Sequence, residues 1–285
     1  MPLQCSILQT QSTHLNNSKR LDTLDFFRFI AILSVMLFHY YSRWNPPENT
    51  TSLYPFGAKY NFFQWGRYGV EFFFIISGFV ITYTLHATNT VADFWKRRFI
   101  RLFPAMVFAS LITRLLMVLL DKDNLFIQGH SLLNYLVSIT FLPPVLLNRI
   151  LAPLHIQGHY LSGSYWSLWP ELQFYFLASL IYFSNRAKFA RNFSFIGTGL
   201  FLLYLLMYSM DSGKLPVHLS DAVRAAYIVC ASVFNLPFYM PWFLTGVLLH
   251  EVFVHKATKL TWGACLPPFC WAFAPVYCGR GMPRR

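Results

Sequence analysis

The sequence predicts an all-α protein, a polytopic membrane helix bundle. Of its 285 residues, 55% are hydrophobic and only 12% are charged, and the mean hydropathy is +0.42. Apolar runs recur along the chain, several of them near the roughly 17–25 residues that a helix needs to span a bilayer. Since no soluble domain stands beside these runs, the composition excludes an ordinary soluble globular protein.

The chain divides into three parts by composition. Residues 1–20 are polar, contain Lys19 and Arg20, and lack the apolar core of a signal peptide, so we expect a cytosolic N-terminal tail. Residues 21–254 form the expected transmembrane domain. Residues 255–285 are an atypical C-terminal segment, in which cysteine and proline crowd where phenylalanine dominates before.

We expect about seven to eight transmembrane helices plus one re-entrant segment. The segment 132–147 has only sixteen residues and contains Pro143 and Pro144, which favours a re-entrant or interfacial position over a full crossing. The expected spans are about 23–42, 69–86, 102–120, 165–184, 194–210, 222–236, 238–254 and 262–278.

The net charge of +12 follows the expected topology and does not indicate nucleic-acid binding, because most of it is divided among short loops between apolar segments. Two basic loops, 93–101 and 185–191, should both face the cytosol under the positive-inside rule. With 132–147 re-entrant, the number of crossings between the two loops agrees with this rule. Their cations are Lys96, Arg97, Arg98, Arg101, Arg186, Lys188 and Arg191.

The five cysteines show neither metal-ligand spacing nor a disulfide framework, and three of them lie in the last 21 residues. We therefore expect no metal.

Arg28 and His39 lie in one otherwise apolar segment, eleven residues apart. On an α-helix this spacing corresponds to three turns plus about 20°, so both side chains share one face, about 16 Å apart. A polar group at mid-bilayer depth costs about 3 kcal/mol and should face the protein interior or a wet cavity. The alternative is an arginine that extends to the membrane surface and a histidine bonded to a neighbouring helix.

Glu171 lies about two turns into the span that begins at Tyr165. In the expected topology this span starts outside, so Glu171 reaches a depth similar to that of His39. A carboxylate beside a histidine orients the ring and raises its basicity, as a general base requires. The alternative is a structural ion pair or hydrogen bond to another helix.

For four further residues in the apolar segments, the sequence favours structural roles. Gly78 should allow close helix packing, and Ser77 should bond back to its own helix. Trp166 and Trp169 are typical of interfacial anchors or packing, with stacking on a sugar as the alternative.

Four ordered blocks over residues 21–175 resemble the acyltransferase 3 family of bacterial multi-pass membrane O-acyltransferases. They are the Arg28–His39 spacing, the sequence GVEFFFIISGF from Gly69, the sequence FWKRRFIRLFP from Phe94, and the sequence YWSLWPELQFY from Tyr165.

The resemblance implies a bacterial inner (plasma) membrane protein with a cytosolic acyl-CoA donor, acetyl-CoA above all. The acceptor would be a hydroxyl of a cell-surface or extracytoplasmic carbohydrate. Arg28, His39 and Glu171 would be the catalytic residues. Arg97, Arg98 and Arg101 would lie near the donor, where guanidinium groups suit its phosphates. These three arginines could alternatively serve only as a topology signal in contact with anionic lipid.

Two other functions stay open. A transporter or flippase could use His39 and Glu171 as a polar relay, although the sequence shows no internal repeat of the kind that transporters carry. The second is an inactive, truncated acyltransferase, because the family domain has about ten helices and the last residues suggest a frameshifted or truncated tail.

Overall fold

The computed structural model describes residues 23–43, 61–122, 126–212 and 220–255. Within these ranges every regular element is a helix, which confirms the predicted all-α class. The chain divides into two compact units, Met1–Ile76 (unit 1) and Ser77–Arg285 (unit 2). The boundary falls inside helix α2 (Gly69–His86).

Unit 1 contains the first span, Thr23–Ser42, and a 3-10 helix, η2 (Asn61–Tyr68), that leads into α2. The span ends in a π-helical turn, η1 (His39–Arg43). Two glycines allow the close approach of the two segments. A Cβ on Gly66 would clash with the carbonyl oxygen of Ser34, and one on Gly69 would lie 2.6 Å from that of Ala31. These contacts place backbone against backbone, as small residues do between membrane helices.

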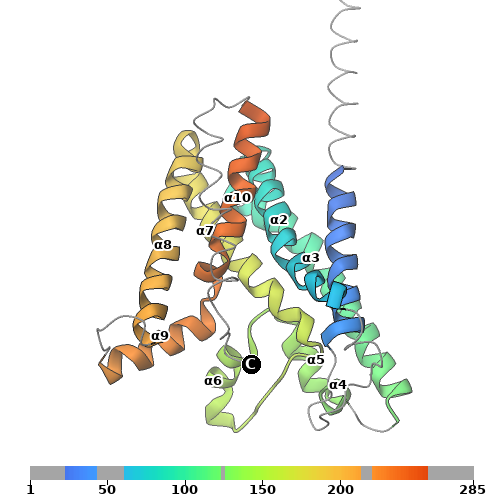
Figure 1. Cartoon of the computed structure of the whole chain (residues 1–285). Coiled ribbons are helices and arrows are strands. Elements are labelled where there is room, and N and C mark those ends of the chain that lie inside the picture. Colours follow the sequence, from blue (N-terminus) through green and yellow to red (C-terminus); the bar gives the residue numbers. More distant parts are fainter. Residues whose placement is uncertain (1–22, 44–60, 123–125, 213–219, 256–285) are drawn as a thin grey trace, which may run out of the picture. The chain divides into compact units, whose positions relative to one another are not determined.

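Unit 2 contains the rest of α2 and eight further α-helices in its described part, joined by three 3-10 turns (Figure 1). The α-helices are α3 (Val91–Leu120), α4 (Ile127–His130), α5 (Leu132–Ile139), α6 (Pro144–Leu151), α7 (Leu168–Ser184), α8 (Phe189–Asp211), α9 (Asp221–Val233) and α10 (Leu236–His255). The 3-10 turns are η3 (Ala152–Leu154), η4 (Gly163–Ser167) and η5 (Arg186–Lys188).

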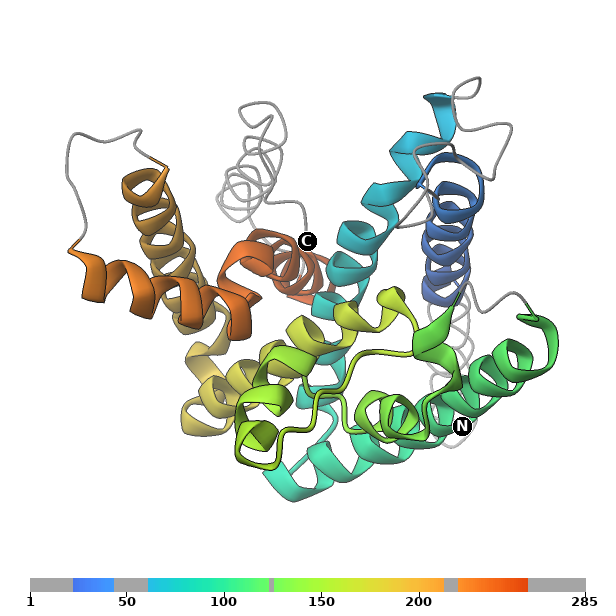
Figure 2. The ribbon, with the colours of Figure 1, turned by 90° about the horizontal axis from the view of Figure 1, so that it is seen from below.

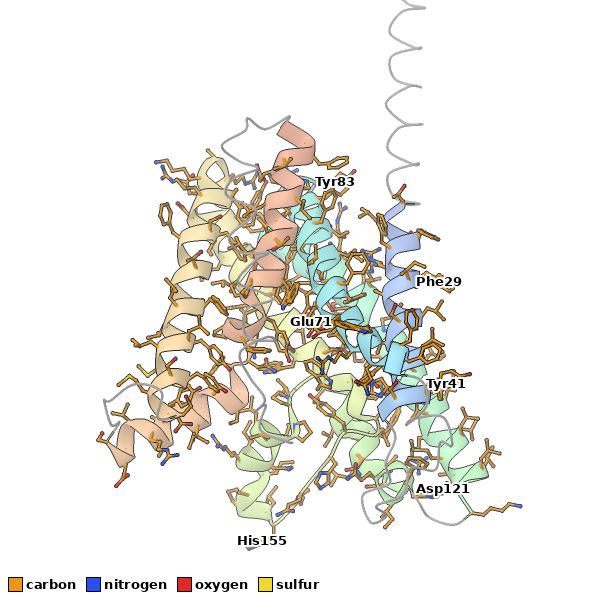
Figure 3. The ribbon with its side chains drawn as sticks, viewed as in Figure 1. Phe29, Tyr41, Glu71, Tyr83, Asp121 and His155 are labelled. Atoms are coloured by element: carbon orange, nitrogen blue, oxygen red, sulfur yellow. The ribbon has the colours of Figure 1, made fainter. Side chains whose placement is uncertain are left out.

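The basic segment 93–101, predicted to be a loop, lies within α3, so that prediction was wrong, whereas 185–191 covers the turn between α7 and α8 and the start of α8. Both basic segments start at the same end of unit 2. The turns between α2 and α3 and between α7 and α8 are neighbours, because Arg186 Nη2 donates a hydrogen bond to the carbonyl of Asn89. Figure 3 shows Tyr83 toward this end and Asp121 and His155 at the opposite one. We call the end with the two basic segments the basic end and the opposite end the far end. The positive-inside rule requires both basic segments on one side of the membrane, and their position at one end of unit 2 agrees with it.

Four helices of the described chain are long and apolar enough to cross a membrane, or up to six if each bent helix pair is one span. Along the 30-residue α3, which rises about 45 Å, large apolar side chains are exposed, among them Phe108, Leu115 and Leu119. Because such a surface is unfavourable in water, it faces lipid and identifies an integral membrane protein.

The segment predicted to be re-entrant forms a helical hairpin at the far end. The helices Leu132–Ile139 and Pro144–Leu154 meet at 114°. Asn134 Oδ1 accepts from the backbone N–H of His159, and the Asn148 side chain exchanges two hydrogen bonds with the backbone of Gly158. Figure 2, seen from below, shows this green segment across the far end of the unit. Such side-chain bonds satisfy non-helical backbone near a membrane.

The predicted spans 222–236 and 238–254 correspond to α9 and α10, which are bent by 46° at their junction. At 13 residues α9 rises only about 20 Å, too short for a hydrocarbon layer of about 30 Å, so the pair makes one broken span. Gln173 of α7 stabilises the break by donating to the carbonyl of Val233 and accepting from the N–H of Leu236. The predicted span 262–278 and the atypical segment lie outside the described residues.

Candidate active site

Glu171 lies in the first turn of α7, toward the far end of unit 2. The residue is 6% exposed, and its carboxylate accepts two hydrogen bonds at the same oxygen. Ser77 Oγ donates to Glu171 Oε1 at 2.6 Å, and the hydroxyl of Tyr175 donates to Oε1 from one turn further along α7. Two hydroxyl donors therefore fix the orientation of this carboxylate.

The consecutive residues Ser77 and Gly78 have different roles in the structure. Gly78 packs as predicted, since a Cβ there would clash with the carbonyl oxygen of Phe243 in α10. The expectation that Ser77 bonds back to its own helix was wrong, because its hydroxyl donates to Glu171 instead. The close approach at Gly78 and the bond from Ser77 arise on consecutive residues of α2.

The two tryptophans near Glu171 take part in packing. The indole N–H of Trp169 donates to the carbonyl of Val233 at 2.5 Å, which adds to the hold of Gln173 on the broken span. The ring of Trp166 lies 5.6 Å from that of Tyr239 in α10. Both contacts agree with the packing role that the sequence favoured.

The three arginines predicted near the donor differ in their surroundings. Arg97 and Arg101 are exposed near the start of α3, one turn apart on one side of the helix. Arg98 is only 5% exposed, and its Nη2 donates to the hydroxyl of Thr84. Its guanidinium also lies over the rings of Phe94 and Tyr175, at 5.7 and 5.6 Å from their centroids. Only Arg97 and Arg101 are thus open to a ligand arriving at the surface.

Arg28 and His39 both lie in unit 1, on the first span. Arg28 Nη1 donates to Asp25 Oδ1 at 2.6 Å, and this partner lies one turn earlier on the same span. His39 is half-buried, meets the ring of Phe38 edge-on at 5.4 Å, and opens the π-helical turn. Turns of this kind are frequent at functional sites. The pairing of His39 with Glu171 would join the two units and stays a prediction.

Sequence reasoning missed two further polar features. Tyr175 follows Glu171 by four residues, and this one-turn spacing was the signal that could have paired them. The second is a histidine pair toward the basic end, His86 and His250, whose rings are stacked with centroids 5.3 Å apart. No sequence pattern links residues from such distant segments, so only packing could reveal this pair.

Among the described residues, no group of three histidine, cysteine, aspartate or glutamate side chains could hold a metal ion. The polar site near Glu171 consists of hydroxyls, one carboxylate and one guanidinium. These groups suit the orientation of a reacting side chain or an oxygen-rich ligand.

Apolar helices around a buried carboxylate, with two exposed arginines at one end, define an integral membrane protein that carries a polar site among its helices. The chain belongs to the acyltransferase 3 family, because the family model, described as an acyltransferase domain, matches residues 21–283. The resemblance drawn from the four sequence blocks is thereby confirmed.

Curated relatives carry related names. A Staphylococcus aureus (strain COL) protein named "Putative O-acetyltransferase SACOL0978" is 24% identical over 229 residues, which cover 70% of this chain and 32% of that protein. O-acetyltransferase OatA of S. aureus (strain NCTC 8325 / PS 47) is 31% identical over 111 residues, 37% of this chain and 15% of OatA. The chain thus spans at most about a third of these relatives. No solved structure matches it.

Proposed function

We propose that this chain is a membrane-embedded O-acyltransferase. It moves an acyl group, acetyl in the first instance, from cytosolic acyl-CoA to a hydroxyl of an extracytoplasmic carbohydrate. The observation that carries the proposal is the buried Glu171 carboxylate, oriented by Ser77 and Tyr175 in a chain of this family. The names of the relatives support acetyl transfer to oxygen.

The chemistry needs a base, a path for the acyl group and a site for the leaving thiolate. His39 removes the proton from the acceptor hydroxyl, whose oxygen attacks the thioester carbonyl. The C–S bond breaks, and CoA leaves as its thiolate, which takes up a proton. Glu171 orients the His39 ring and stabilises its cationic form, and Arg28, about 16 Å from His39 on the same span, stabilises the donor or the charge that develops along the passage.

The donor binds at the basic end. Coenzyme A carries several phosphate charges, which planar guanidinium groups bind in a bidentate manner. Arg97 and Arg101 are exposed and share one side of α3, and the turn that precedes α3 contacts the neighbouring basic turn through Arg186. Arg98 lies behind them with its guanidinium engaged inside the unit.

We expect Arg97→Lys and Arg101→Lys together to raise the KM for acetyl-CoA about 10-fold, with kcat within threefold of the wild type. Lysine keeps the charge that sets membrane orientation but lacks the planar, bidentate donor group. Steady-state transfer at varied donor concentration measures this effect. Arg191→Lys, in the first turn of α8, is the matched control and should leave the KM unchanged. Unchanged donor saturation in the double variant would reduce the cluster to a topology signal.

The proposed orientation places the basic end in the cytosol and the far end outside, in the inner membrane of a bacterium. We expect a cysteine at Ser162 to react with an impermeant maleimide only from the outside, and one at Asn185 only from the cytosol. The native cysteines are first replaced, and insertion of each variant is verified. Labelling of position 162 from the cytosol would show that unit 2 has the opposite orientation, with Glu171 toward the inner face. That result would exclude the pairing with His39.

A transfer assay on membranes tests the function itself. Membranes that contain the chain should move a radiolabelled acetyl group from acetyl-CoA to an envelope carbohydrate, and empty membranes should not. Each variant is compared at equal protein level. The absence of label in every carbohydrate fraction, with intact protein inserted, would contradict the proposal.

A further inference from the structure

A row of buried polar side chains joins three helices of unit 2. Ser77 and Thr84 lie two turns apart on α2, and Glu171 and Tyr175 lie one turn apart on α7, so each pair occupies one helix face. Arg98 enters the row from α3. Four of the five, all but Thr84, are at most 6% exposed.

Tyr175 is the central member of this row. Its hydroxyl donates to Glu171 Oε1, the oxygen that also accepts from Ser77. Its ring faces the guanidinium of Arg98, with 5.6 Å between the ring centroid and Cζ. One side chain therefore contacts both a buried anion and a buried cation, and it is itself only 2% exposed.

This arrangement lowers the cost of burying two charged groups among membrane helices. A carboxylate and a guanidinium buried among membrane helices are each costly unless they find polar partners and opposite charge. Hydrogen bonds from two hydroxyls satisfy one oxygen of the carboxylate, and the face of an aromatic ring attracts the guanidinium. In the described part of the chain, both hydrogen bonds to Glu171 end at Oε1, which leaves Oε2 for a further partner.

We propose that Tyr175 is a positioning residue for Glu171 and that Arg98 acts as its internal counter-cation. The hydroxyl of Tyr175 fixes the carboxylate so that Oε2 points to the group it serves, and the ring of Tyr175 seats Arg98 behind it. Arg98 then supports turnover, whereas Arg97 and Arg101 hold the donor. The part that concerns turnover rests on the proposed function, while the contact between Tyr175 and Glu171 does not.

The kinetic test is Tyr175→Phe, which removes one hydroxyl and keeps the ring over Arg98. We expect kcat for transfer to fall about 10- to 100-fold, with the KM values for donor and acceptor within twofold, because a charge-assisted hydrogen bond is lost while the binding surfaces remain. Tyr182→Phe is the matched control. It makes the same change on a buried tyrosine two turns further along α7, whose ring contacts His86, and should leave kcat unchanged.

Arg98→Lys separates the roles of the arginines. Lysine keeps the charge but cannot place a planar guanidinium over the ring of Tyr175. We expect a lower kcat with an unchanged donor KM, the opposite of the result for the Arg97 and Arg101 variant. A raised donor KM with unchanged kcat would make Arg98 a donor ligand and overturn its assignment as counter-cation.

A stability measurement tests the contact without any activity. We expect Tyr175→Phe and Glu171→Gln to be non-additive in thermal unfolding of the purified protein in detergent. Tyr175→Phe removes the donor of the hydrogen bond to Glu171, and Glu171→Gln removes the charge that strengthens the same bond. Tyr182→Phe and Glu171→Gln should be additive. Additive effects for the first pair, or a kcat within twofold in Tyr175→Phe, would overturn the proposal. A wild-type chain without transfer would remove only the proposed function, and the unfolding cycle would still decide the contact.

Discussion

Replacement of His39 by alanine should abolish acyl transfer while the protein still inserts into the membrane. General-base catalysis contributes about 10²–10⁴-fold, so the transfer rate at saturating donor and acceptor should fall by at least that factor. Removal of an imidazole from an apolar span should, if anything, ease insertion. The measurement is acetyl transfer on membranes at matched protein level, with insertion verified by extraction and labelling.

His159→Ala is the matched control for this variant. The His159 side chain is exposed, and the residue is held through its backbone N–H, which donates to Asn134 and is kept in the variant, so the substitution should leave transfer unchanged. A His39→Ala variant within threefold of the wild type would show that His39 is not the base. The alternative role of His39, a structural hydrogen bond to a neighbouring helix, would then be the better interpretation.

The second large effect is expected at Glu171. In Glu171→Gln the side-chain oxygen can still accept from Ser77 and Tyr175, but the neutral amide cannot stabilise a cationic imidazole. Loss of a charge-assisted interaction costs about 1.5–3 kcal/mol, so we expect transfer to fall about 10- to 100-fold. This is less than the loss in His39→Ala.

The comparison of Glu171→Gln with His39→Ala shows whether Glu171 supports His39 or takes part in the chemistry itself. Glu251→Gln, a carboxylate of α10 that lies 3.7 Å from His250, is the matched control and should leave the rate unchanged. If Glu171→Gln is as damaging as His39→Ala, Glu171 takes part directly in the chemistry. If the two substitutions are additive in the double variant, the proposed pairing is wrong even where both residues are essential.

The sequence predicted the class of fold because the bilayer constrains composition so strongly. Apolar runs between short basic loops led to an all-α membrane protein, and two prolines in a sixteen-residue segment led to the bent hairpin of α5 and α6. The structure was needed to show that the predicted spans 222–236 and 238–254 form one broken span. The 13 residues of α9 are too few to cross the membrane alone, and the bonds of Gln173 that stabilise the break come from another helix, α7.

The sequence by itself determined the membrane class and the family, and it supplied the proposed catalytic residues, because spacing along one helix and ordered motifs are properties of the chain. The tertiary structure decided which of these residues meet. Ser77 and Glu171 are 94 positions apart, and only the packing of α2 against α7 brings the hydroxyl to the carboxylate. Burial likewise separated Arg98 from Arg97, neighbours that one helical step of about 100° turns to different sides of α3.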